Sequence, residues 1–126
     1  MEKNGLILAS RTGANVQVVR LFALFHDSRR INDLVDEGHG QRGAEYAAQL
    51  RGMLYDLDDG SFALLEYACT WHTDQRFSKD ATIGTCWDAD RLDLGRVGMI
   101  PHEDFMSTAF GKEVARMGSF YPFISG

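Results

Sequence analysis

The segment from Val18 to Phe25 constrains the fold more than any other part of this chain. Every residue in it except Arg20 is apolar. A helix that begins at a capping residue, Asn15, and runs to about Arg29 would be apolar on nearly every side. We therefore expect this helix to lie at the centre of a helical bundle.

The apolar segment ends on a polar pair, His26 and Asp27. Polar groups that a helix carries into the core need partners there, and a metal ion satisfies both an imidazole and a carboxylate. Adjacent positions on an ideal helix point about 100° apart, so both side chains reach one ion only near a helix end or a bend. A helix C-cap is an equally good interpretation of the spacing.

The length and composition predict one soluble domain over residues 1–126. Two prolines among 126 residues favour an all-α protein, and a net charge of −5 argues against broad nucleic-acid binding. No apolar stretch reaches the ~20 residues of a membrane span. The N-terminus lacks the layout of a signal peptide, so we expect a cytoplasmic protein without membrane contact. Cys69 and Cys86 form no CxxC motif and are expected to be reduced thiols.

Hydrophobic spacing and turn residues predict five to six helices. Gly13 fits the end of the first helix, and Pro101 begins a turn before the last. The expected helices cover residues 2–12, 15–29, 39–50, 61–72, 83–94 and 103–117. The aromatic tail from Ser119 to Phe123 either packs on the core or mediates association.

A second histidine, His39, stands between two glycines at the start of the third expected helix. Residues 38–43 match the pattern G-x-G-x-x-G, but an acidic loop precedes them where a dinucleotide site needs a strand. The glycines are better explained by close backbone approach at a crowded site. Taken alone, His39 is better explained as a surface residue at a helix start than as a ligand.

A third histidine, His72, shares a helix face with Cys69. A Cys-His zinc pair is conceivable, but a structural zinc site is not expected because the chain has no second such pair. The alternative is a hydrogen-bonded core histidine next to a core thiol.

The segment 86–93 carries three acids, of which Asp90 shares a helix face with Cys86. An acid on a buried face needs a cation, either a metal ion or a nearby arginine. Asp88 points elsewhere, and with Asp93 it is better placed as a supporting or structural acid. Surface Asp-Arg pairs are the alternative for all three.

The order HD, H, H, D across successive helices resembles the HD-domain superfamily of metal-dependent phosphohydrolases. The resemblance covers Thr12 to about Thr108, and it implies a compact all-α bundle of five to six helices. Its strongest stretches are LFALFHDSRR (21–30), GHGQRGAE (38–45) and CWDADRLDLG (86–95).

The resemblance also implies a ligand set. The metal-binding doublet falls on His26 and Asp27, and the final metal-binding aspartate falls on Asp90. The extra histidines of versions with a larger metal centre fall on His39 and His72. The implied cofactor is a divalent metal ion such as Mn, Mg, Fe, Ni or Zn.

The implied reaction is hydrolysis of a phosphoester or nucleotide, with Asp27, His39 and His72 in the catalytic machinery. Arg29, its neighbour Arg30, and Arg42 lie beside the motifs and could bind phosphate oxygens of a small phosphorylated substrate. A solvated surface charge is the alternative for each arginine.

One feature departs from the family pattern. The first metal ligand of the superfamily is a histidine on a preceding helix, and no histidine precedes His26. We therefore expect an N-terminally shortened domain with weak or absent hydrolase activity, and a homodimer that covers the exposed apolar surface. The alternative is a catalytically inactive HD-like oligomeric domain with a binding or structural role.

Overall fold

A computed structural model describes residues 2–26, 38–72, 75, 77–93 and 102–120. The all-α prediction is confirmed: these residues form six α-helices and one short 3-10 helix, and no strand occurs among them. The elements are α1 (Glu2–Thr12), α2 (Val16–Phe25), α3 (His39–Leu50), α4 (Asp59–Trp71), α5 (Ala81–Leu92), η2 (Glu103–Phe105) and α6 (Ala109–Met117).

Capping residues set most of the helix starts. Asn15 caps α2 as expected, and its side-chain oxygen accepts a hydrogen bond from the backbone of Val18. Two helices begin two residues earlier than predicted because aspartates cap them. Asp58 accepts the backbone N–H of Ser61 at the start of α4. Asp80 accepts the backbone N–H groups of Thr82 and Ile83 at the start of α5.

The prediction of one helix over residues 103–117 is wrong. The chain forms η2, then an extended turn, and α6 begins only after Thr108. The turn arises because Asp88 accepts the backbone N–H groups of both Ser107 and Thr108. A continuous helix would use those N–H groups in its own ladder.

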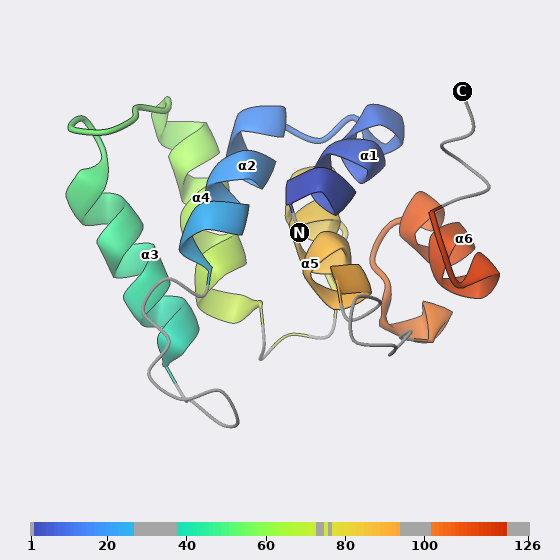
Figure 1. Cartoon of the computed structure of the whole chain (residues 1–126). Coiled ribbons are helices and arrows are strands. Elements are labelled where there is room, and N and C mark those ends of the chain that lie inside the picture. The colour runs from blue at the N-terminus through green and yellow to red at the C-terminus, as the bar shows by residue number, and fades with distance from the viewer. Residues whose placement is uncertain (1, 27–37, 73–74, 76, 94–101, 121–126) are drawn as a thin grey trace.

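As expected, α2 lies at the centre. It contacts α1, α3, α4 and α5, and Figure 1 shows α3 and α4 on one side of it and α1 and α5 on the other. Its buried side chains Val18, Val19, Phe22 and Phe25 fill the main core. A second apolar cluster, which includes Leu8 and Val114, joins α1 and α5 to α6.

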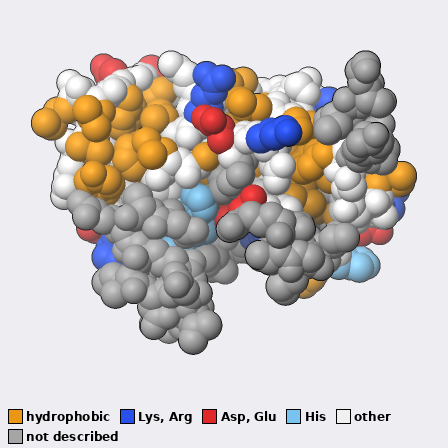
Figure 2. All heavy atoms as spheres, viewed as in Figure 1, with side chains coloured by type: hydrophobic (Ala, Val, Ile, Leu, Met, Phe, Trp, Pro, Cys, Tyr) orange, Lys and Arg blue, Asp and Glu red, His pale blue; other side chains and the backbone are white. Residues whose placement is uncertain are grey.

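Several large apolar side chains remain at the surface. Leu24 of α2 and Met53 and Leu54 of the α3–α4 turn are each more than half exposed. Figure 2 shows apolar side chains gathered on the part of the surface where α3 and α4 join. None of the helices in the described part of the chain is long and apolar enough to cross a membrane.

Candidate functional site

Two glycines bring α3 close to the carboxyl ends of α2 and α4. A Cβ atom at Gly40 would overlap the carbonyl oxygens of Cys69 and Thr70, and one at Gly43 would overlap the carbonyl oxygen of Phe25. The predicted close backbone approach is therefore confirmed at Gly40. Gly38 has a different reason, a left-handed backbone with φ of +80°. This packing places the first residue of α3 beside the last turns of α2 and α4.

His39 and His72 meet at this junction. Their Nε2 atoms lie 3.0 Å apart, and both side chains are almost fully buried. The Nδ1 atom of His72 lies 2.7 Å from the carbonyl oxygen of Cys69, which can only accept, so Nδ1 carries the proton. In a neutral His72 the Nε2 atom then holds a lone pair, and His39 donates its Nε2–H to it.

His26, the C-cap of α2, makes a parallel arrangement with Asp90 of α5. Its Nδ1 donates to the carbonyl oxygen of Phe22 at 2.9 Å, and its Nε2 lies 3.2 Å from Oδ1 of Asp90. A neutral imidazole with this tautomer would point a lone pair at a carboxylate. A proton or a metal ion between the two groups would relieve that repulsion.

The two pairs are neighbours. The ring centroids of His26 and His72 are 5.2 Å apart, and the ring of Phe22 stacks on His26 at 4.8 Å and meets the ring of His72 edge-on at 5.9 Å. The histidines are buried, whereas the side chain of Asp90 is 27% exposed. Figure 2 shows histidine and acidic side chains near one another in the middle of the face. Asp90 thus lies where the buried histidines meet solvent.

The spacing of each pair suits a shared cation. Two donor atoms bound to one ion at ~2.1 Å, with an angle between about 90° and 109°, lie about 3.0–3.4 Å apart. The His39–His72 and His26–Asp90 distances of 3.0 and 3.2 Å fall in this range. Within the described ranges, however, no three His, Cys, Asp or Glu side chains are arranged around one point. The described residues therefore supply two pairs of atoms that could each bind an ion, but they form no complete set of metal ligands.

The other predicted site residues are distributed as follows. Asp27, Arg29 and Arg30 lie outside the described residues. Arg42 lies one turn into α3, half-buried, and its guanidinium lies over the backbone of Gly38. The structure thus places one of the predicted phosphate-binding arginines beside the amino end of α3.

Asp88 belongs to the scaffold, as expected. Its fully buried carboxylate accepts hydrogen bonds from the backbone of Ser107 and from the backbone and hydroxyl of Thr108. Burial raises the pKa of Asp88 above its usual value, and these hydrogen bonds oppose that rise. The carboxylate joins α5 to the start of α6.

Phe22 is a further member of the site that the sequence pattern did not indicate. Its carbonyl oxygen fixes the tautomer of His26 and its ring contacts two imidazoles. The spacing of four residues between Phe22 and His26 places them on one helix face, and that signal could have identified the contact.

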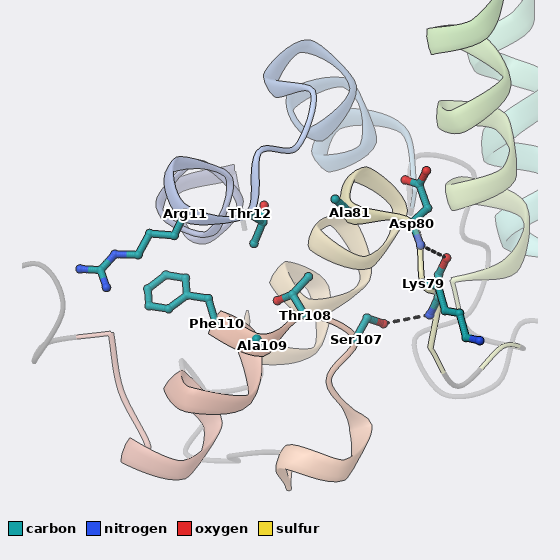
Figure 3. A pocket seen from close by; sticks show the side chains of 10 residues that line it. Arg11, Thr12, Lys79, Asp80, Ala81, Ser107, Thr108, Ala109 and Phe110 are labelled. Carbon is teal, nitrogen blue, oxygen red and sulfur yellow. Dashed lines mark hydrogen bonds between the residues drawn. The ribbon is translucent and has the colours of Figure 1, made fainter.

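A separate pocket of about 280 Å³ lies where the end of α1 meets the starts of α5 and α6 (Figure 3). Its hydroxyl groups bond within the protein: Thr12 to Thr85, Ser107 to the backbone of Ser78, and Thr108 to Asp88. These bonds show how three helix ends are joined. The candidate functional site is therefore the group formed by His26, His39, His72 and Asp90, which we call the histidine cluster.

Comparison with known proteins adds no further identification. No family model, curated protein or solved structure matches this chain. Any function must therefore be argued from the side chains of the histidine cluster.

Proposed function

We propose that the histidine cluster is the metal site of an HD-type phosphohydrolase. One observation carries the proposal. His26 and His72 each donate a hydrogen bond from Nδ1–H to a backbone carbonyl, and each directs its Nε2 toward another atom that can bind a metal ion. Histidines that bind metals are commonly fixed in this way, because the outer hydrogen bond sets the tautomer and the ring orientation.

In this proposal His26, Asp27 and Asp90 hold a divalent ion. Asp27 follows His26 directly, so it can complete a set in which the described residues supply two donors 3.2 Å apart. His39 and His72 would hold a second ion or contact substrate phosphate. A bound ion would polarise the phosphoryl group and activate water.

The substrate would be a small phosphoester or nucleotide. Arg42 lies beside Gly38 at the amino end of α3, where a guanidinium and the helix dipole both favour an anion. Arg29, three residues after His26 in sequence, is proposed as a second phosphate contact. Asp90 is the partly exposed member of the cluster, so substrate would approach from its side.

Calorimetric titration of chelator-treated protein with Mn²⁺, Ni²⁺ or Zn²⁺ tests the metal site. We expect at least one ion per chain, with binding weakened about tenfold or more in His26→Ala and Asp90→Ala. His102→Ala is the control, because His102 is exposed and pairs with Asp104. Binding no tighter than millimolar, or equal weakening in the control, contradicts the proposal.

The hydrolase activity is tested separately with p-nitrophenyl phosphate and added Mn²⁺. We expect slow turnover that Asp27→Ala and Asp90→Ala both abolish and His102→Ala leaves intact. Tight metal binding without any turnover would support the proposed metal site but contradict the proposed hydrolase activity.

The alternative function is a catalytically inactive oligomeric domain. The observation that favours it is the exposed apolar surface at Leu24, Met53 and Leu54. Sedimentation equilibrium should then give a dimer that Leu54→Lys dissociates, with no loss of metal binding. A species of 14.1 kDa alone would contradict it.

A further inference from the structure

A second surface feature lies outside the histidine cluster, between α3 and α4. These helices pack side by side (Figure 1), and a groove of about 680 Å³ runs between them. The lining includes the small side chains of Ala44 and Ala63. The small residues leave room for an incoming side chain between the two helices.

The walls of the groove carry acidic and aromatic groups. Glu45 of α3 and Glu66 of α4 supply two exposed carboxylates. Tyr67 and Trp71 of α4 are 39% and 40% exposed, so part of each aromatic ring is accessible to a ligand. Among the described residues that line the groove, none is lysine or arginine.

We propose that this groove binds a basic segment of a partner protein, with a lysine or arginine side chain between apolar ones. The aromatic faces attract a cation through their negative π-surfaces, and the carboxylates neutralise its charge. The alkyl stem of the same side chain covers the small residues in the groove.

An extended open groove suits a peptide segment better than a small enclosed ligand. A free cation would leave most of the apolar lining in contact with water, whereas a peptide covers the lining with its neighbouring side chains. The net charge of −5 adds a long-range attraction for a basic partner. The groove shares no residue with the four members of the histidine cluster, so the two proposals fail independently.

Intrinsic fluorescence provides the test. The chain has two tryptophans, of which Trp87 is fully buried and Trp71 is partly exposed in the groove. Titration with a short lysine–leucine peptide should shift the emission of Trp71 and saturate. A matched glutamate–leucine peptide should produce no shift, and added salt should weaken the lysine complex.

Matched charge variants locate the binding. Glu66→Gln should raise the dissociation constant of the lysine peptide about threefold, whereas Glu113→Gln, which removes the same charge from the exposed side of α6, should leave it unchanged. Trp71→Ala should weaken binding about tenfold when binding is measured by anisotropy of a labelled peptide.

The proposal would be overturned by a lack of saturable binding of the lysine peptide, by equal weakening in Glu66→Gln and Glu113→Gln, or by equal binding of the glutamate peptide. Concentration-dependent dimerisation that Trp71→Ala abolishes would also overturn it, because a second copy of the chain would then be the occupant.

Discussion

Thr108 donates both its backbone N–H and its hydroxyl to Oδ2 of Asp88, at 2.8 and 2.6 Å. Twenty residues separate the two in sequence. The same hydroxyl accepts the backbone N–H of Gly111, so it caps α6 while it is bonded to α5. The start of α6 is therefore fixed by a buried carboxylate on another helix.

Loss of this carboxylate should destabilise the protein. Asp88→Ala leaves the N–H groups of Ser107 and Thr108 without their acceptor, at a cost of about 2–4 kcal/mol. Urea unfolding measures the change. Asp104→Ala, at an exposed position on η2, should cost less than about 0.5 kcal/mol and serves as the control. Equal effects of the two substitutions would contradict the assigned role.

The titration of Asp88 should make the free energy of unfolding depend on pH. Burial raises the pKa of Asp88 above 3.8, so the folded protein holds this proton more tightly than the unfolded chain. Its contribution is complete below about pH 3.8 and is lost as the pH rises through the folded-state pKa. The stability of wild type relative to Asp88→Asn, measured by urea unfolding, should therefore fall with rising pH and then level off. A rise in this relative stability with increasing pH would contradict the expected role of Asp88.

The contact at Gly40 predicts a steric effect. Gly40→Ala would force α3 away from the last turn of α4 and should cost about 1–3 kcal/mol, despite the better helix propensity of alanine. Gly60→Ala, in the first turn of α4, places its Cβ at an ordinary contact distance of 3.4 Å from the carboxylate of Asp58 and should be neutral or slightly stabilising. Thermal unfolding of both variants measures the difference, and a stabilised Gly40→Ala would refute the close approach.

Arg91 should be harder to replace than an exposed arginine. Its guanidinium donates to the carbonyl oxygens of Gln75 and Phe105 at 2.6 and 2.8 Å, and burial lowers its pKa. Lysine cannot span both acceptors, so Arg91→Lys should cost about 1–2 kcal/mol. Arg20→Lys, in an exposed pair with Glu2 at 3.9 Å, should change the unfolding free energy by less than about 0.5 kcal/mol.

A comparison of Phe22 with Phe25 can separate the positioning of the histidine rings from the packing of the core. Both are buried on α2, but Phe22 contacts His26 and His72 whereas Phe25 contacts Tyr46 and Tyr55. Each change to leucine should cost about 1–2 kcal/mol in unfolding free energy. Under the proposed function only Phe22→Leu should weaken Mn²⁺ or Ni²⁺ binding, by several-fold in calorimetry. Equal metal affinities would show that Phe22 only fills space.

Local signals in the sequence predicted most of the helices. Asn15 and Gly13 mark boundaries that depend only on their immediate neighbours, and the apolar run of α2 required a central position. The break before α6 was not predictable in this way. It depends on Asp88, which reaches Ser107 and Thr108 only after the chain has folded.

The candidate site was predictable as a group of residues, but its pairing was not. The sequence indicated His26, His39, His72 and Asp90, and the structure brings them together as two adjacent pairs. The pairing depends on the ring orientations and tautomers of His26 and His72. Hydrogen bonds to the carbonyl oxygens of Phe22 and Cys69 set both. The side chain of Asp27 falls outside the described residues, so its part in the site stays a prediction.

The turn between α3 and α4 has a consequence for folding order. Arg51 bonds Leu57 and Asp59 and lies over the ring of Phe62, so this helical hairpin closes through contacts near in sequence. Closing a short loop costs little chain entropy, so we expect the hairpin to form early in folding. The packing of α1 on α5 closes a much longer loop and should come later. His39 and His72 lie at ends of the two helices of this hairpin, so we expect them to meet before Asp90 of α5 reaches His26 at the end of α2.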